Sequence, residues 1–172
     1  MSYKIITAPA VEPLLLATVK TRLSISDTLD DPDINALIQA AREQAEEYMG
    51  RSIITQTLEI AFNCFPDDIE LVRGPVQSIT SVKYIDGDDT EQTVTATNYM
   101  IDDYGPKDWL RLDYGKSWPA SRGHTNDVKI RYVTGWGDAG TDVPEDIRTA
   151  MLLLIGHWIR FQAEAESGVG PT

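Results

Sequence analysis

The two histidines are the first residues to consider for catalysis, because histidine is the side chain that most often moves protons near neutral pH. His124 lies in a loop with glycine and serine, and His157 lies on the less apolar face of a predicted helix. The sequence contains no Gly-x-Ser-x-Gly turn, no phosphate-binding glycine-rich loop and no His-Glu-x-x-His pair. We therefore predict solvated or hydrogen-bonded histidines and no catalytic residues.

Carboxylates gather at two places where a metal ion could bind. One group consists of Asp27, Asp30, Asp31 and Asp33, and its order lacks the alternating oxygen ligands and central glycine of a calcium loop. The other group, at residues 86–89, lies between two strand patterns, where Asp-Gly is the ordinary hairpin turn. We predict no metal site and no cofactor. A glycosidase pair of carboxylates stays open, because the separation of two carboxylates depends on the fold.

Aromatic residues concentrate in the middle and later part of the chain, at Trp109, Tyr114, Trp118, Tyr132 and Trp136. Such residues can stack on sugars, but packing in a core and anchoring an interface are commoner uses. Two alternatives to a structural role follow. A small carbohydrate-active or hydrolytic enzyme would combine two carboxylates and an aromatic platform in one cleft. A monomeric binding module would bury its last helix within its own chain.

The net charge of −12 at pH 7 limits the partners of this chain of 172 residues. Proteins that bind nucleic acids neutralise phosphates with clustered lysine and arginine, and we find no such cluster along the sequence. We expect no tight binding to DNA, although an acidic wall could line a passage for it. No stretch reaches the roughly 20 apolar residues that span a bilayer, so we expect no membrane partner. The single cysteine, Cys64, is predicted to be a core residue in a reducing cytoplasm.

Helical periodicity predicts helices over residues 14–23, from Asp31 or Asp33 to Met49, and over residues 144–162. In the last helix, one apolar stripe consists of Ile147, Met151, Leu154, Trp158 and Phe161, and a second consists of Leu152, Ile155 and Ile159. Together the stripes cover about half of the circumference, which is wider than a surface helix requires. Such a helix has two apolar neighbours. Either it lies in the middle of its own fold, or one side of it meets another subunit.

Between these helices the pattern changes to β-branched and aromatic residues separated by turns. It predicts antiparallel strands at residues 55–62, 69–72, 79–85, 92–94, 99–101, 109–112 and 128–134. The fold class is therefore α+β, with N- and C-terminal helices packed together and an antiparallel β-rich lobe inserted between them. We expect one domain over residues 1–172. Its parts are a helical part (14–50), the β-rich lobe (53–137), the C-terminal helix (144–162) and a flexible tail (163–172).

Several short strings occur in an order that resembles a known family. Gly50-Arg51 ends a helix and Ile54-Thr55-Gln56-Thr57 begins a strand. Further along are Arg73-Gly74-Pro75-Val76-Gln77-Ser78, Tyr114-Gly115-Lys116-Ser117-Trp118-Pro119 and Val133-Thr134-Gly135-Trp136-Gly137, followed by Val143-Pro144 and Ile147. From about Leu16 to Trp158, the chain resembles the head-tail connector proteins of tailed bacteriophages and prophages, also called adaptor or head-completion proteins. Gene transfer agents use similar subunits.

The resemblance implies a structural protein with no catalytic residues to carry over. About a dozen copies would form a ring beneath the portal and extend the DNA channel toward the tail. The partners would be other copies, the portal protein, and a stopper or tail terminator protein on the tail side. DNA would pass through without tight binding. The protein would belong to the virion or gene transfer agent particle, after a period in the host cytoplasm.

A ring subunit needs two different contact surfaces, and three segments supply candidates. The last helix offers its second stripe, and the loop at residues 115–126 offers exposed positions of the kind that often carry function. The end of the chain, at residues 167–172, could order as an extended strand on a portal at low entropic cost. The Arg73-Gly74-Pro75 turn is either a simple turn between strands or part of an interface. The candidate interface residues are Leu152, Ile155, Ile159, Lys116, Trp118, Val169 and Pro171.

Overall fold

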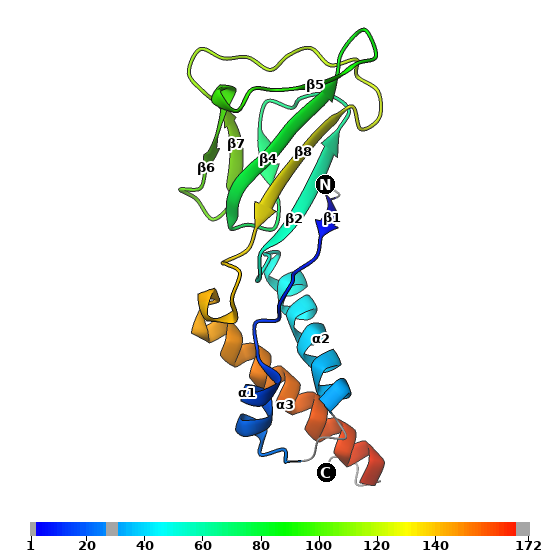
Figure 1. The fold of residues 1–172 in the computed structure, drawn as a ribbon, viewed down its shortest axis with the longest axis vertical. Helices are drawn as coiled ribbons and strands as arrows, with labels where there is room; N and C mark the ends of the chain where they lie inside the picture. Colours follow the sequence, from blue (N-terminus) through cyan, green and yellow to red (C-terminus); the bar gives the residue numbers. More distant parts are fainter. Residues whose placement is uncertain (1–2, 27–30, 168–172) are drawn as a thin grey trace. The chain divides into compact units, whose positions relative to one another are not determined.

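The computed structural model describes residues 3–26 and 31–167, with side chains up to residue 162. The chain divides into two compact units, and each unit is assembled from two separate segments (Figure 1). The β unit consists of Met1–Ala10 and Gly50–Trp136. The helical unit consists of Val11–Met49 and Gly137–Thr172.

Two antiparallel sheets form the β unit. The larger sheet has five strands in the order β1-β2-β8-β4-β5, and the smaller has three in the order β3-β7-β6. The larger sheet consists of β1 (Tyr3–Thr7), β2 (Gln56–Phe62), β8 (Val128–Thr134), β4 (Val76–Ile85) and β5 (Glu91–Thr93). The smaller consists of β3 (Ile69–Leu71), β7 (Asp108–Leu112) and β6 (Tyr99–Asp102), the last preceded by a short 3₁₀ helix, η1 (Ala96–Asn98).

The inner faces of the two sheets meet in a single core. Every second residue of β8 contributes to it, because successive side chains of a strand point to opposite faces. Val128, Ile130 and Tyr132 are fully buried, whereas Lys129 is exposed, which confirms the alternation predicted for this strand. The smaller sheet contributes Ile69, Leu71 and Leu110 to the same core. The outer faces of the two sheets therefore lie on opposite sides of the β unit.

The corner between β3 and β4 carries the chain from one sheet to the other. Two hydroxyl groups of β8 bond to the backbone of this corner. The Tyr132 hydroxyl donates to the Val72 carbonyl at 2.8 Å. The Thr134 hydroxyl lies 2.5 Å from the Arg73 carbonyl oxygen and 2.9 Å from the Pro75 carbonyl oxygen. Thr134 and Tyr132 are both fully buried, and burial raises the pKa of the tyrosine. The Tyr132 hydroxyl thus satisfies a carbonyl that would be costly to leave without a donor, and the Thr134 hydroxyl adds to the Ser52 and Gly135 amides, which donate to the Arg73 and Pro75 carbonyls.

Two glycines allow close backbone approaches at this corner. A Cβ atom at Gly74 would lie 2.0 Å from Oδ2 of Asp108, the oxygen that accepts the Val76 amide at 2.8 Å. Gly135 has a φ of +124°, and a Cβ there would lie 2.5 Å from the carbonyl carbon of Ile54. Neither neighbour leaves room for a side chain. The Arg73-Gly74-Pro75 string therefore serves the fold as a turn between strands.

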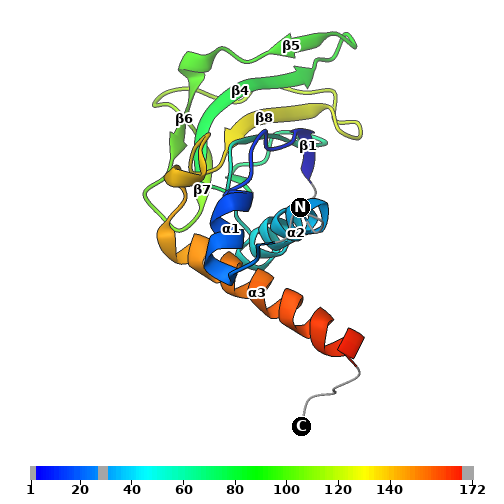
Figure 2. The same cartoon turned by 60° about the horizontal axis from the view of Figure 1, so that its bottom comes forward.

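The helical unit contains α1 (Leu16–Leu23), α2 (Asp31–Met49), the short 3₁₀ helix η2 (Gly140–Asp142) and α3 (Glu145–Ser167). Helices α1 and α2 lie on the same side of α3 (Figure 2). The contact with α1 is close, because a Cβ at Gly156 would lie 3.1 Å from Cδ2 of Leu23. The buried apolar residues of the unit include Val19, Ile34, Ile38, Ala41, Val143, Met151 and Ile155.

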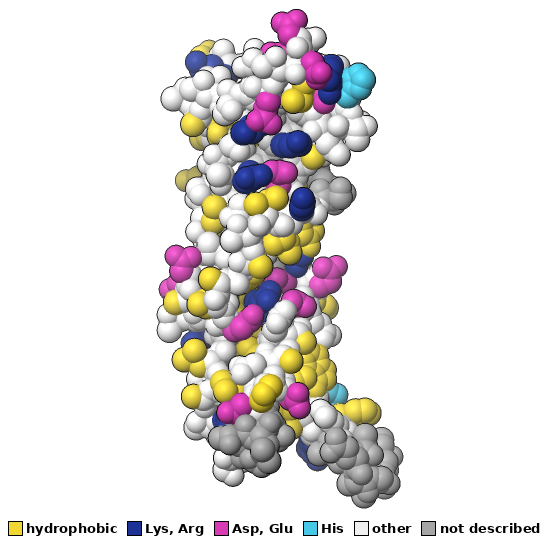
Figure 3. Space-filling view, turned by 45° about the vertical axis from the view of Figure 1, so that its right-hand side comes forward, with side chains coloured by type: hydrophobic (Ala, Val, Ile, Leu, Met, Phe, Trp, Pro, Cys, Tyr) yellow, Lys and Arg dark blue, Asp and Glu magenta, His cyan; other side chains and the backbone are white. Residues whose placement is uncertain are grey.

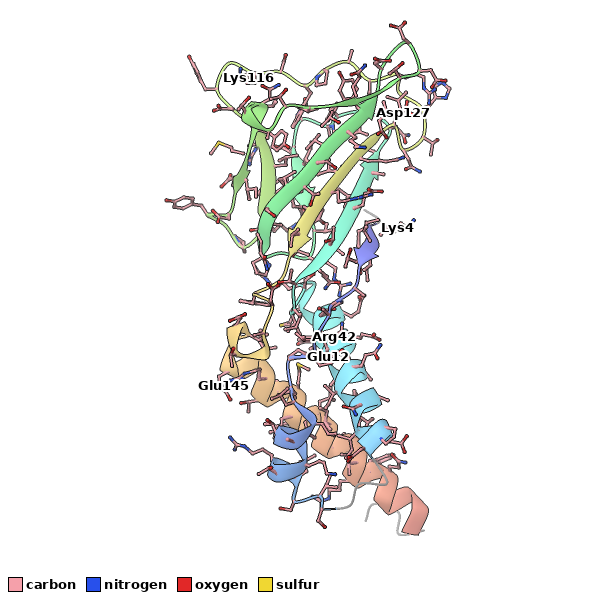
Figure 4. The ribbon with its side chains drawn as sticks, in the orientation of Figure 1. Lys4, Glu12, Arg42, Lys116, Asp127 and Glu145 are labelled. Carbon is pink, nitrogen blue, oxygen red and sulfur yellow. The ribbon has the colours of Figure 1, made fainter. Side chains whose placement is uncertain are left out.

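A buried arginine joins the segment before α1 to α2. The Arg42 side chain is only 8% exposed. Its Nε and Nη2 donate to the two carboxylate oxygens of Glu12 at 2.8 and 3.2 Å, and its Nη1 donates to Oε2 of Glu46 at 3.3 Å (Figure 4). The two-pronged pair compensates for the removal of the guanidinium from water and fixes the entry of the chain into the helical unit.

The predicted α+β fold is confirmed: α2 packs against α3, and the seven predicted strands are present between them in the sequence. One strand was not predicted. Residues 3–7 form β1, which pairs antiparallel with β2. The run Tyr-Lys-Ile-Ile-Thr has the β-branched composition of a strand, but it is short.

Two further expectations need correction. Helix α3 continues to Ser167, five residues beyond its predicted end at residue 162, because residues 163–166 alternate alanine and glutamate, which favour helix. The predicted tail therefore does not begin at residue 163, and residues 168–172 lie outside the described part of the chain. Cys64 is exposed rather than buried, since it lies in the loop after β2.

We predict that Thr134→Val destabilises the β unit by roughly 0.5–1.5 kcal/mol, because it keeps the side-chain shape but removes a buried hydrogen bond, while the Ser52 and Gly135 amides still donate to the Arg73 and Pro75 carbonyls. Urea unfolding followed by tryptophan fluorescence measures this change. A Trp158→Phe background restricts the signal to the tryptophans of the β unit. Thr57→Val, on the outer face of β2, is the control and should have little effect. Equal stability of the two variants would show that the hydroxyl of Thr134 is dispensable.

Candidate functional site

The apolar surface of α3 differs from the predicted one. Ile155 is fully buried within the helical unit, so it belongs to the core and not to the surface of the chain. Leu152 and Ile159 are half-buried. The exposed apolar side chains are Leu153, at 70%, and Phe161, at 56%. Leu153 belongs to neither predicted stripe, and its exposure could not be read from the helical period alone.

The loop between β7 and β8 carries two other candidates. Lys116 is exposed, whereas Trp118 is half-buried and stacks on Phe65 with ring centroids 4.7 Å apart and an interplanar angle of 3°. These residues line a pocket of about 540 Å³ together with Cys64 and Asp67. Trp118 therefore helps to pack the loop, and Lys116 is free to reach a partner. The remaining candidates, Val169 and Pro171, lie outside the described residues.

Asp127 anchors the far end of this loop (Figure 4). Its carboxylate accepts hydrogen bonds from Nη2 and Nε of Arg122 at 2.9 and 3.3 Å, and from the His124 amide at 2.7 Å. The side chain of Asp127 is almost fully buried. The Arg122 hydrogen bond, aided by that of the His124 amide, holds the pKa of the Asp127 carboxyl below its ordinary value.

Cations gather on the outer face of the larger sheet. Directly opposite residues of antiparallel strands lie on the same face, so the sheet register identifies them. One row joins Lys4, Glu59 and Arg131 across β1, β2 and β8. The next row places Lys129 of β8 opposite Lys83 of β4. We call these four cations, Lys4, Lys83, Lys129 and Arg131, the basic face.

Two of the four cations have carboxylate partners. Arg131 donates to Glu59 at 2.7 Å through Nη2, and Lys83 donates to Glu91 at 2.6 Å. Among the described residues, Lys4 and Lys129 have no ion pair. In the upper part of Figure 3, several Lys and Arg side chains (dark blue) lie close together. The expectation that the chain has no clustered cations is therefore wrong, because the cluster is assembled from three strands that are distant in sequence.

The outer face of the smaller sheet has the opposite character. Its carboxylates and those beside it include Asp68, Glu70, Asp102 and Asp103. Arg111 pairs with Asp68 at 2.6 Å and with Asp102 at 3.3 Å, and Lys107 pairs with Glu70 at 3.0 Å. The Arg111 guanidinium lies 5.3 Å from the Trp109 ring centroid. Beyond these pairs, the β6–β7 hairpin (residues 99–112) exposes Met100 on β6, and Tyr104 at its turn is fully exposed.

Two pockets of the chain differ from the cleft expected of a carbohydrate-active enzyme. A pocket of about 330 Å³ in the helical unit is lined by Glu12 and Asp138 but by no aromatic residue, and Glu12 is already paired with Arg42. The pocket beside Trp118 has aromatic residues and a single carboxylate. Neither combines the two features. In the described part of the chain, no group of three or more His, Cys, Asp or Glu residues could hold a metal ion, and no helix there is long and apolar enough to cross a membrane.

Comparison with known proteins identifies the family. Residues 14–170 match the head completion protein family, so the chain belongs to that family, in agreement with the resemblance of its sequence strings. No curated protein matches. Among solved structures, a chain in the neck of an empty gene transfer agent particle is similar, with a TM-score of 0.79 and 20% identity. That match covers 93% of this chain and 84% of the other.

Two further solved chains have the same identity and coverage. They come from the virion of a native gene transfer agent particle, with a TM-score of 0.78, and from the neck of a native particle computed with C12 symmetry, with a TM-score of 0.74. At this level of identity the likeness demonstrates a common fold.

We predict that Asp127→Asn lowers the melting temperature at pH 7 and makes it less sensitive to acid. Because the folded-state pKa of Asp127 is depressed, its contribution is fully present above the unfolded value of about 3.9 and is lost as the pH falls through the lower folded value. Melting curves of both proteins between neutral and strongly acidic pH measure this. Asp67→Asn, in an exposed loop, is the control. Parallel pH profiles for wild type and Asp127→Asn would contradict the assignment.

Proposed function

We propose that the chain is a structural subunit that connects the DNA-filled head of a phage-like particle to its tail. The observation that carries this proposal is the match of residues 14–170 to the head completion protein family. The fold similarity to chains from particle necks supports it. The match spans segments of both compact units, so we propose that the two units act together as one connector domain.

In the proposed arrangement, about a dozen copies form a ring beneath the portal and extend the DNA channel. The C12 symmetry applied to one similar neck supports this copy number. Ring subunits meet through two different surfaces, and the described chain has several that are distinct in chemistry: the exposed side of α3, the basic face and the acidic outer face of the smaller sheet. A particle neck, phage or gene transfer agent, is then the location of the protein.

The proposed partners are the portal protein on the head side and a stopper or tail terminator protein on the tail side. Leu152 and Ile159, together with the exposed Leu153 and Phe161, are proposed contacts on α3. Lys116 is a proposed contact on the loop, with Trp118 as its support. Residues 167–172, with Val169 and Pro171, remain our proposed docking segment for the portal.

The alternatives have less support. An enzyme of the carbohydrate-active or hydrolytic class needs two carboxylates and an aromatic platform in one cleft, and neither the pocket beside Glu12 nor the pocket beside Trp118 has both. A monomeric binding module would bury α3 within its own chain, yet Leu153 and Phe161 are exposed. We propose that the subunit performs no covalent chemistry.

The decisive experiment removes the gene from the strain that encodes this chain. DNA-filled heads without tails should accumulate, and DNA delivery should fall to the background of the assay, because the head lacks its connection to the tail. Electron microscopy and delivery assays measure both effects, and a plasmid copy of the gene should restore them. Mass spectrometry of purified necks should detect the chain. Normal numbers of tailed particles in the deletion strain would contradict the proposal.

A second prediction concerns the exposed side of α3. Leu153→Glu and Phe161→Glu should each leave the melting temperature almost unchanged, because surface substitutions usually alter stability by less than about 0.5 kcal/mol. Each should nevertheless reduce the amount of subunit in particles, since a charge would be placed in an apolar contact. Gln162→Glu adds the same charge at another exposed position of the helix and is the control. Normal incorporation of all three variants would show that this side of α3 is not part of the interface.

A further inference from the structure

We infer that the basic face of one copy binds the β6–β7 hairpin of the next copy, and that this contact joins neighbours in the ring. The inference rests on the proposed function and specifies which surfaces of the subunit meet. Both surfaces belong to the β unit, so the inference depends on no arrangement between the two compact units.

The basic face needs an anionic partner. Lys83 and Lys129 are directly opposite each other on β4 and β8, and like charges in such a pair are destabilising. Glu91 bonds Lys83, and Lys129 has no bonded carboxylate among the described residues. Lys4 likewise has none. Four cations against the two carboxylates Glu59 and Glu91 leave this surface positive, although the chain as a whole carries −12.

The β6–β7 hairpin has the complementary chemistry. Asp103 is exposed and has no ion pair among the described residues, and it is followed by the fully exposed Tyr104. Tyrosine is enriched among residues that dominate binding energy, because it buries a large apolar ring and retains a hydroxyl for hydrogen bonding. Met100, exposed on β6, adds apolar surface to the same hairpin. The hairpin thus combines an aromatic anchor with an unpaired carboxylate.

The placement of the two surfaces favours a second copy of this chain as the partner. The basic face lies on the outer face of the larger sheet, and the hairpin belongs to the smaller sheet, whose outer face lies on the opposite side of the shared core. One copy can therefore use its hairpin toward one neighbour and its basic face toward the other. A contact of this head-to-tail kind closes into a ring when the rotation between copies is suitable.

DNA is the competing occupant of a basic face, and it fits less well. Two of the four cations are already paired with Glu59 and Glu91, and the net charge of −12 opposes the approach of a polyanion. The hairpin of another copy places the unpaired Asp103 and a tyrosine on the face, because its cations Lys107 and Arg111 are already paired with Glu70 and Asp102. We therefore assign the face to the hairpin of the neighbouring copy.

The first test is cross-linking in assembled particles. In a Cys64→Ser background, which removes the exposed natural thiol, one strain carries Tyr104→Cys, a second carries Lys129→Cys, and a third expresses both chains. A short bismaleimide should link two subunits only in particles that contain both chains, because each contact pairs position 104 of one copy with position 129 of the next. Covalent dimers are measured by mass spectrometry.

The second test reverses charges at exposed positions. Lys129→Glu and Asp103→Lys should each lower incorporation into particles by roughly tenfold, because like charges then face each other across the contact. A chain with both changes should recover, because its contacts again pair opposite charges. A mixture of the two single variants should recover as well, because contacts between unlike variants pair opposite charges and a ring with an even number of copies can alternate them. Melting temperatures of the purified variants check that each chain is folded.

The outcomes of these tests distinguish a failure of the proposed contact from a failure of the proposed function. Subunits present in necks without the 104–129 cross-link, or charge variants that incorporate normally, would overturn this inference and leave the proposed function intact. Absence of the wild-type chain from purified necks would overturn both. If Lys129→Glu incorporates normally but abolishes binding to duplex DNA in an anisotropy titration at low salt, the face binds nucleic acid and the inference is wrong.

Discussion

The β unit depends on how its chain crosses from one sheet to the other. At the corner between β3 and β4, the carbonyl groups of Val72, Arg73 and Pro75 need donors from other segments, and the Ser52 and Gly135 amides supply those of Arg73 and Pro75. From β8, the strand that lies between β2 and β4, the Tyr132 hydroxyl supplies the donor for Val72, and the Thr134 hydroxyl adds a second donor at Arg73 and Pro75. A side chain in this position has to be largely apolar, to pack in the core, and has to carry one hydroxyl group, to donate to a carbonyl of the corner.

The same strand also determines the outer surface. Because side chains alternate along β8, the arrangement that directs Tyr132 and Thr134 inward directs Lys129 and Arg131 outward. A shift of one residue in its register would bury two cations and expose the core residues. The core of the β unit and the position of the cations on its outer face thus depend on the register of a single strand.

The elements of the fold were predictable where the pattern was long or regular, as in residues 128–134 and in α2. Strand β1 was missed because five residues near the start of the chain give a weak pattern. The cluster of cations was only partly predictable. The alternation of β8 places Lys129 and Arg131 on one face, but Lys4 and Lys83 join them through a strand order, β1-β2-β8-β4-β5, that the sequence does not reveal. For α3, the periodicity identified the apolar half of the helix but not which of its residues are buried against α1 and α2. Ile155 was therefore expected at an interface, although it is buried, and the exposed Leu153 was not among the candidates.

Strand β1 also affects how copies of this protein can associate. It forms one edge of the larger sheet, and its register shifts between Ile5 and Thr7. The other edge, β5, is only three residues long. Irregular or very short edges, and lysines such as Lys4 upon them, are poor templates for backbone pairing with another molecule. Association through strand addition would continue without a fixed end point and produce fibres, whereas contacts between side chains permit assemblies of limited size.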